Sequence, residues 1–106
     1  MRVKSVMLQR VLGDAPKSII LRNVSPMLCR LMKEPFDRPG WIFEIKWDGF
    51  RAIAEVGKDG VKLYSRNQRS FNKRFADIVT SLEQLGPEVV LDGEVVALDE
   101  EGKSRF

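Results

Sequence analysis

The most chemically distinctive segment of this sequence is Lys46–Arg51, which runs Lys-Trp-Asp-Gly-Phe-Arg. It combines an amine, a carboxylate, a guanidinium and a glycine that lets the backbone approach a ligand closely, and these groups suit a phosphate. A lysine amine attacks phosphorus only when it is neutral, and its ordinary pKa of about 10.4 leaves roughly one molecule in a thousand deprotonated near neutral pH. The charge of Arg51, or of a bound divalent cation, would lower that pKa by repulsion.

Two carboxylates near this lysine, Glu44 and Asp48, act in the opposite sense, because a negative charge stabilises the ammonium form. They are therefore better suited to bind a ligand or a metal ion. The hexapeptide alone is explained about equally well by a Glu–Lys surface pair followed by an Asp-Gly hairpin turn.

Two later segments carry side chains of complementary type. Four cations alternate with Phe71 and Phe75, as they do on surfaces that follow a nucleic-acid backbone: Arg66, Arg69, Lys73 and Arg74. Asp92 and Glu94 are two residues apart, so on a strand they share one face, where they could meet a ribose hydroxyl or a metal ion. Taken alone, the first pattern is more often the solvated start of a helix and the second a bulge with an acidic rim.

The pattern around these segments predicts a small α+β fold, mainly antiparallel sheet with one covering amphipathic helix. Alternating side chains indicate strands over residues 41–46, 50–56, 61–65 and 89–98, the first three joined as a meander. The first strand would hold Glu44 and Lys46 side by side. Asn72 is the expected N-cap of a helix that ends at Gly86-Pro87. The apolar face of that helix consists of Phe75, Ile78, Val79, Leu82 and Leu85.

Length and composition limit the chain to one small domain or a piece of one. It has 106 residues, a net charge of +3 and an uneven charge distribution, positive over residues 1–40 and negative over 88–106. One cysteine and no histidine exclude a disulfide framework, a Cys/His zinc site and any imidazole-dependent triad within the chain. No apolar stretch reaches the roughly 18–20 residues that span a bilayer, so we expect a soluble intracellular protein without membrane contact.

The N-terminal part is less strongly patterned. We expect residues 1–25 to form a flexible lead-in or linker, because Gly13, Pro16 and Pro26 interrupt them. The apolar side chains that follow are expected to cover the edge of a core: Met27, Leu28, Leu31, Met32 and Phe36.

Taken in order, these pieces resemble the nucleotidyltransferase, or adenylation, domain of ATP-dependent DNA ligases, within the superfamily that includes RNA ligases and mRNA capping enzymes. Lys46-x-Asp48-Gly49-x-Arg51 matches the family's first motif, Ser65-Arg66 the next, and Asp92-Gly93-Glu94 the third. The segment 26–106 looks most like bacterial and archaeal end-joining repair ligases. The resemblance implies the N-terminal half of the adenylation domain, a partial nucleotidyltransferase fold of ATP-grasp-like type.

The resemblance also implies a role for each matched residue. Lys46 would be the nucleophile that takes AMP from ATP as a lysyl-phosphoramidate and releases pyrophosphate. Asp48 would lie near a Mg²⁺ or Mn²⁺ ion. Arg66 would guide the 5′-phosphate of a nick. The implied nucleotide contacts are Glu44 and the Ile45 backbone at the adenine, Arg51 at the ribose and phosphate, and Glu94 at the ribose hydroxyls, while Arg69, Lys73 and Arg74 would be further DNA contacts.

The family's remaining motifs and its OB-fold domain would lie beyond Phe106. We therefore expect a half-site that is inactive in ligation by itself and self-associates through an exposed sheet edge. The implied partners are nicked duplex DNA and other end-joining repair proteins, and the implied location is the cytoplasm, at the nucleoid of a prokaryote. Two alternatives stay open: an RNA ligase or capping-type nucleotidyltransferase, and a nucleic-acid-binding fragment without catalysis.

Overall fold

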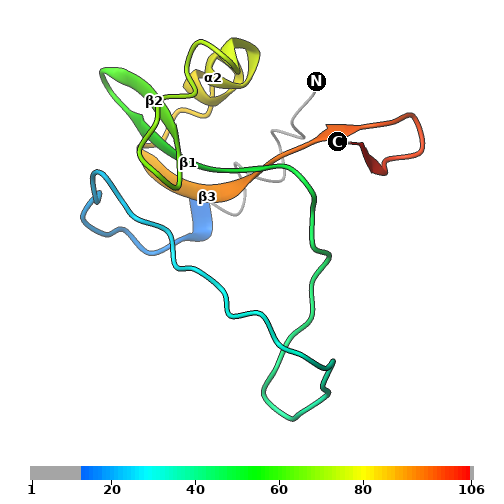
Figure 1. Cartoon of the computed structure of the whole chain (residues 1–106). Coiled ribbons are helices and arrows are strands. Elements are labelled where there is room, and N and C mark those ends of the chain that lie inside the picture. The colour runs from blue at the N-terminus through cyan, green and yellow to red at the C-terminus, as the bar shows by residue number, and fades with distance from the viewer. Residues whose placement is uncertain (1–12, 106) are drawn as a thin grey trace.

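The computed structural model describes residues 13–105. Its sheet is formed by strands β1 (Phe50–Gly57), β2 (Gly60–Ser65) and β3 (Val89–Val95), and helix α2 (Ala76–Glu83) lies against one face of it (Figure 1). A two-stranded hairpin of β4 (Ala97–Leu98) and β5 (Ser104–Arg105) follows. A sheet-rich α+β fold with a covering helix is thus confirmed.

Strand β1 is the centre of the sheet, in the order β2-β1-β3, and it pairs antiparallel with both neighbours. The β1–β2 hairpin closes at Gly57 and Gly60, which face each other across a two-residue turn. Gly60 has a φ of +120°, a conformation that residues with a side chain rarely adopt. The tight connection predicted over 57–60 is confirmed.

The face of the sheet toward α2 is apolar because alternate residues of β1 and β2 point to it. The buried side chains of this core are Ala52, Ala54, Val56, Val61 and Leu63 from the strands, with Leu82 and Leu85 from the helical segment. Phe75, Ile78 and Val79 pack against them at the predicted helical spacing. The helix therefore has the amphipathic face that the sequence predicts.

The opposite face is covered by residues 22–27, here called the N-terminal strap. Figure 1 shows this blue-to-cyan segment on the side of the sheet away from α2. Beneath it Glu55 is buried in the middle of β1, together with Tyr64 of β2. The backbone N–H groups of Asn23 and Val24 donate hydrogen bonds to the Glu55 carboxylate and the Tyr64 hydroxyl, at 2.5 and 2.8 Å. The first twelve residues of the expected lead-in lie outside the described residues.

The strand predicted over 41–46 is wrong. Both edges of β1 are occupied by β2 and β3, so this segment cannot pair with β1, and it runs in the long connection before β1 (Figure 1). Its aromatic side chains form a local cluster: the rings of Trp41 and Phe43 lie 4.8 and 6.4 Å from that of Phe36. An alternating sequence pattern indicates which side chains would share a face of a strand, but it does not identify the neighbouring strand that must supply the hydrogen bonds.

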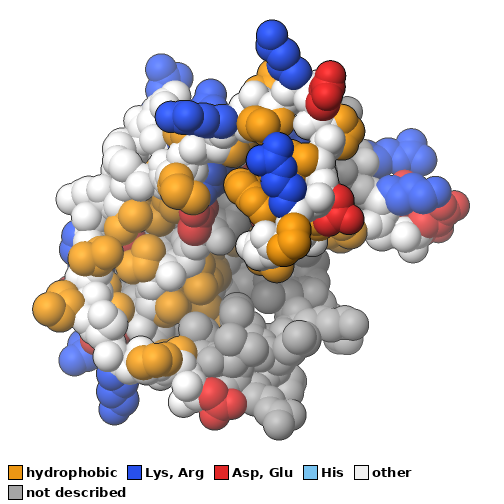
Figure 2. Space-filling view, turned by 90° about the horizontal axis from the view of Figure 1, so that it is seen from below, with side chains coloured by type: hydrophobic (Ala, Val, Ile, Leu, Met, Phe, Trp, Pro, Cys, Tyr) orange, Lys and Arg blue, Asp and Glu red, His pale blue; other side chains and the backbone are white. Residues whose placement is uncertain are grey.

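The predicted cover of the core edge by the start of this connection is also wrong. Met27 and Leu31 are 86% and 98% exposed, and the view from below shows many apolar side chains at the surface (Figure 2). The chain here leaves the strap and runs away from the sheet, so these side chains contact neither the α2 core nor the face beneath the strap (Figure 1).

Asn72 is not the N-cap of the helix, which is Phe75. The Asn72 side chain caps the outer edge of β2 instead: its Oδ1 accepts the Leu63 N–H at 2.8 Å, and its Nδ2 donates to the Val61 carbonyl at 2.7 Å. Asparagine serves both purposes because its amide matches the donor and acceptor of a peptide group. The segment after β2 thus shields part of a strand edge that would otherwise be unpaired.

The connection into β1 brings two backbones very close together. A Cβ placed on Gly49 would overlap the carbonyl oxygen of Val95, so the glycine of the first motif is required here by the chain's own packing. Asp99 organises the turn between β4 and β5, since its carboxylate accepts the N–H groups of Glu101 and Lys103. Over residues 13–105, no helix has the length and apolar character needed to cross a bilayer.

Candidate functional site

The sheet brings Arg51 of β1 and Asp92 of β3 into a two-pronged ion pair. Arg51 Nε donates to Asp92 Oδ1 at 2.9 Å, and Nη2 donates to Oδ2 at 2.6 Å. Arg51 Nη1 donates at 2.8 Å to the carbonyl oxygen of Met27 in the N-terminal strap. Three N–H groups of the Arg51 guanidinium are thus engaged, two by Asp92 of β3 and one by the strap.

Strand register explains this meeting of residues 41 positions apart. Arg51 stands opposite Glu94 in the β1–β3 pairing, and Asp92 is two residues along β3 on the same face. All three side chains therefore lie on the face away from α2. The two hydrogen bonds with Asp92 raise the pKa of Arg51 and lower the pKa of Asp92, so both groups stay charged across the physiological range.

The strap is attached to this face through a buried carboxylate. The Tyr64 hydroxyl donates to Glu55 Oε1 at 2.8 Å, and Asn23 N–H donates to the same oxygen. Burial alone would raise the pKa of Glu55, but these two hydrogen bonds bring the pKa below its usual value. Lys62 and Arg22 act in the same direction. Burial and the hydrogen bond to the Glu55 carboxylate raise the pKa of Tyr64 to about 12.

Lys46 lies apart from this constellation. Lys46, Glu44, Ile45 and Asp48 are all exposed in the connection before β1. Within residues 13–105, no hydrogen bond or ion pair links Lys46 to Arg51. The structure therefore brings Arg51 and Glu94 of the predicted site together on one face, with Asp92 beside them, and leaves the lysine on a separate segment.

The described residues offer a divalent cation an exposed carboxylate beside Lys46 rather than a built site. No cluster of three or more potential metal ligands occurs among the described residues, so a protein cage for an ion is absent from that part of the chain. Mg²⁺, however, usually binds through one or two carboxylates together with substrate phosphates and water. The exposed carboxylate of Asp48, two residues from Lys46, is compatible with that mode.

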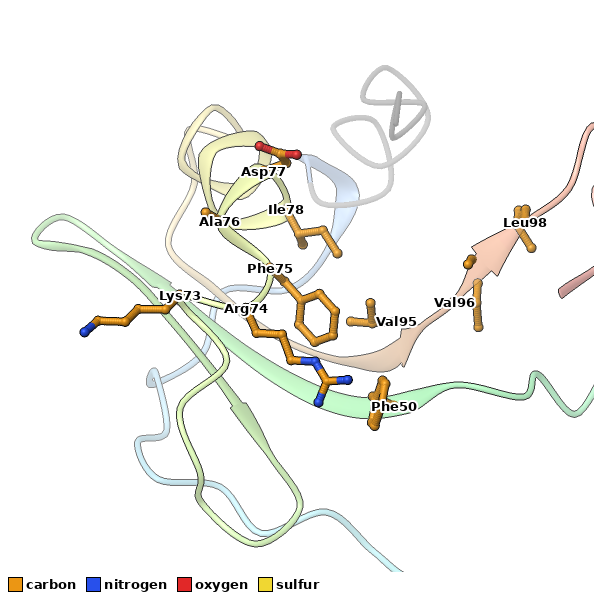
Figure 3. A pocket seen from close by; sticks show the side chains of 11 residues that line it. Phe50, Lys73, Arg74, Phe75, Ala76, Asp77, Ile78, Val95, Val96 and Leu98 are labelled. Carbon is orange, nitrogen blue, oxygen red and sulfur yellow. The ribbon is translucent and has the colours of Figure 1, made fainter. Parts of the chain in front are cut away.

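The predicted DNA-binding cations fall into two groups. Arg66 and Arg69 are exposed in the turn that follows β2. Arg74 lies over the ring of Phe50, with its guanidinium carbon 4.2 Å from the ring centre, and forms one wall of a groove of about 660 Å³ between the start of α2 and the end of β3. Figure 3 shows Arg74 extending along this groove toward Phe50, whereas Lys73 points away from it.

Comparison with known proteins agrees with the arrangement of motifs. The family model described as the ATP-dependent DNA ligase domain matches residues 26–106. The chain is 36% identical over 84 residues to the multifunctional non-homologous end joining protein LigD of Pseudomonas aeruginosa, covering 78% of this chain and 10% of that protein. It is 40% identical over 75 residues to DNA ligase C1 of Mycolicibacterium smegmatis, covering 69% of this chain and 22% of that protein.

A solved structure is similar as well. The ligase domain from M. tuberculosis LigD superposes with a TM-score of 0.54 at 38% sequence identity, covering 59% of this chain and 21% of that one. The chain thus spans about a tenth to a fifth of the length of these proteins. With its matched region and these similarities, the chain belongs to the ATP-dependent DNA ligase domain family, and the resemblance drawn from its motifs is confirmed.

Sequence reasoning missed three features of this face: the pairing of Asp92 with Arg51, the Met27 carbonyl and the Glu55–Tyr64 pair. The partner of Asp92 depends on the register between β1 and β3, which a single sequence does not specify. A usable signal did exist for Glu55, which interrupts the apolar run of β1. A carboxylate in the centre of a buried strand needs partners, and here the strap supplies them.

The ionisation of Tyr64 tests the attachment of the strap, since it is the only tyrosine of the chain. We expect tyrosinate absorbance to rise with a midpoint of about 12 in the folded chain and about 10 after unfolding in urea. Because the pKa is higher in the folded state, the stabilisation is complete below pH 10 and is lost as the pH rises toward 12. Tyr64→Phe should abolish the signal and this part of the pH dependence of unfolding. A midpoint of about 10 in the folded chain would contradict the buried hydrogen bond.

Proposed function

We propose that residues 26–106 form the lysine-bearing half of the nucleotidyltransferase site of an ATP-dependent DNA ligase, which seals nicks in duplex DNA through a lysyl-AMP intermediate. One observation carries the proposal. The three motifs occur in order within the region that matches the ligase family. Pairing of β1 with β3 brings Arg51 of the first motif beside Asp92 and Glu94 of the third motif.

The first step joins Lys46 to AMP. The neutral Nζ of Lys46 attacks the α-phosphorus of ATP, a P–N bond forms, and the bond from the α-phosphorus to the pyrophosphate oxygen breaks. The ammonium form must first lose a proton to solvent, which the exposed position of Lys46 permits. In the next steps an oxygen of the DNA 5′-phosphate displaces Lys46, and the 3′-hydroxyl displaces AMP to seal the strand.

The other residues bind and orient the nucleotide. Glu44 and the backbone of Ile45 contact the adenine amino group, Arg51 contacts the ribose and phosphate side, and Glu94 contacts the ribose hydroxyls. Asp48 would hold a Mg²⁺ or Mn²⁺ ion. Such an ion, when bound, neutralises charge on the phosphate oxygens. The segment that carries Glu44, Lys46 and Asp48 must come up to the Arg51–Glu94 face, and its exposure leaves it free of competing contacts with the sheet.

The DNA contact is centred on Arg66, which guides the 5′-phosphate of the nick, with Arg69 and Lys73 as further contacts. Arg74 contributes least, because its guanidinium already stacks on Phe50. Partners in end joining and self-association at an uncovered strand edge remain part of this proposal. Since the matched ligases are several times longer than the matched stretch, the groups that complete the site come from sequence outside residues 1–106. The family match favours a DNA ligase over an RNA ligase or a capping-type enzyme.

The role of Lys46 is tested in the full-length polypeptide that carries residues 1–106, incubated with radiolabelled ATP and Mg²⁺. We expect Lys46→Ala and Lys46→Arg to lose all covalent label, because neither side chain presents a neutral amine there. Lys33→Ala, which removes another exposed lysine of the same connection, should keep it. Label retained in Lys46→Arg would refute the assignment, and labelling with GTP in place of ATP would favour a capping-type enzyme.

The role of Arg66 is tested by the salt dependence of binding to nicked duplex DNA. Each phosphate contact releases condensed counterions, so we expect Arg66→Ala to reduce the slope of log K against log salt by about one unit. Lys58→Ala is the matched control, because Lys58 is also exposed but lies at the opposite end of β2. An unchanged slope in Arg66→Ala, or an equal change in both variants, would make the cluster an ordinary solvated surface.

A further inference from the structure

Asp92 is a carboxylate on the proposed nucleotide-binding face whose only hydrogen-bond partner among the described residues is Arg51. We propose that Asp92 and the Met27 carbonyl are positioning groups that fix the guanidinium of Arg51 for the nucleotide, and that the Glu55–Tyr64 pair holds the N-terminal strap in place for this purpose. This inference rests on the proposed function, since it assigns a task to the Arg51 of that site.

The pair with Asp92 fixes the plane of the guanidinium. Arginine has a long and flexible side chain, and a single hydrogen bond would leave its head free to rotate. Two parallel bonds, from Nε and Nη2 to the two oxygens of one carboxylate, remove that freedom. A carboxylate on the neighbouring strand, rather than on a loop, also gives this clamp a rigid base.

The Met27 carbonyl supplies the third contact, and its position depends on the strap. Backbone N–H groups of Asn23 and Val24 are bound by Glu55 and Tyr64. The strap is also tied at its sides: Gln68 Nε2 donates to the Val24 carbonyl at 3.1 Å, Lys62 donates to the Asn23 side chain, and Arg22 lies 3.9 Å from Glu55. Because Glu55 and Tyr64 are buried, this end of the strap is fixed to the buried centre of the sheet.

The remaining hydrogen-bonding capacity of Arg51 is what makes the clamp useful to a ligand. A guanidinium has five N–H groups and three are engaged, so two stay available for an oxygen of the nucleotide. The side chain of Arg51 is one-third exposed, which leaves this end open to solvent. A donor that is already oriented loses less conformational freedom when the ligand binds.

A double-mutant cycle in the full-length polypeptide tests the inference, with the KM and kcat for ATP in ATP–pyrophosphate exchange, which forms and reverses lysyl-AMP, as readouts. We expect Asp92→Asn to raise KM roughly tenfold and to keep kcat within about twofold of the wild-type value. A roughly tenfold change is the lower end of the loss in affinity or activity seen when an orienting partner is removed at a metal site. Arg51→Lys should raise KM at least as much. If Asp92 acts only through Arg51, the double variant is no worse than Arg51→Lys alone.

Two further variants separate positioning from stability. Asp92→Glu keeps the carboxylate, so its affinity for ATP should be close to that of the wild type. If residue 92 only filled space, keeping the carboxylate would give no such advantage over Asp92→Asn. Asp59→Asn, the same substitution at an exposed carboxylate of the β1–β2 turn, should leave KM unchanged. Tyr64→Phe should raise KM without changing the coupling between Arg51 and Asp92.

The outcomes distinguish this inference from the proposed function. Independent, multiplicative effects of Arg51→Lys and Asp92→Asn, or a wild-type KM in Asp92→Asn, would overturn the positioning role while lysyl-AMP formation stands. Failure of the wild-type polypeptide to form any lysyl-AMP would overturn both.

Discussion

The double pairing of strand β1 is the constraint on which the rest of this structure depends. Its backbone is hydrogen-bonded to β2 on one edge and β3 on the other, so its register fixes which side chains face α2 and which face the strap. A shift by one residue would exchange the two sets and place Arg51 under the helix. The same pairing leaves no free edge of β1 for the segment that precedes it.

The two faces of that sheet carry different kinds of side chain. Toward α2 the side chains are apolar, and they pack against the helix. On the other face a buried glutamate and tyrosine fasten the strap, and Arg51, Asp92 and Glu94 lie toward the open end. Both faces therefore bury side chains, while the groups suited to a nucleotide gather on the face away from α2.

Sequence patterns were sufficient to predict those elements that depend on residues close together in the chain. The alternation in β1 and β2, the Gly-x-x-Gly turn and the helical spacing from Phe75 to Leu85 all predicted what the structure contains. Features that depend on distant partners were not predictable: the missing partner of residues 41–46, the use of Asn72 on a strand edge, and the Arg51–Asp92 pair. The family could still be recognised, because its motifs preserve residue types that the chemistry requires.

The central claim is that this chain carries the nucleophile of a ligase on the segment just before β1. It is tested most directly by fragmentation mass spectrometry of the full-length polypeptide after incubation with ATP and Mg²⁺. The account predicts one added AMP, located on the side chain of Lys46. An AMP found on any other residue, such as Lys33 or Lys62, would contradict it.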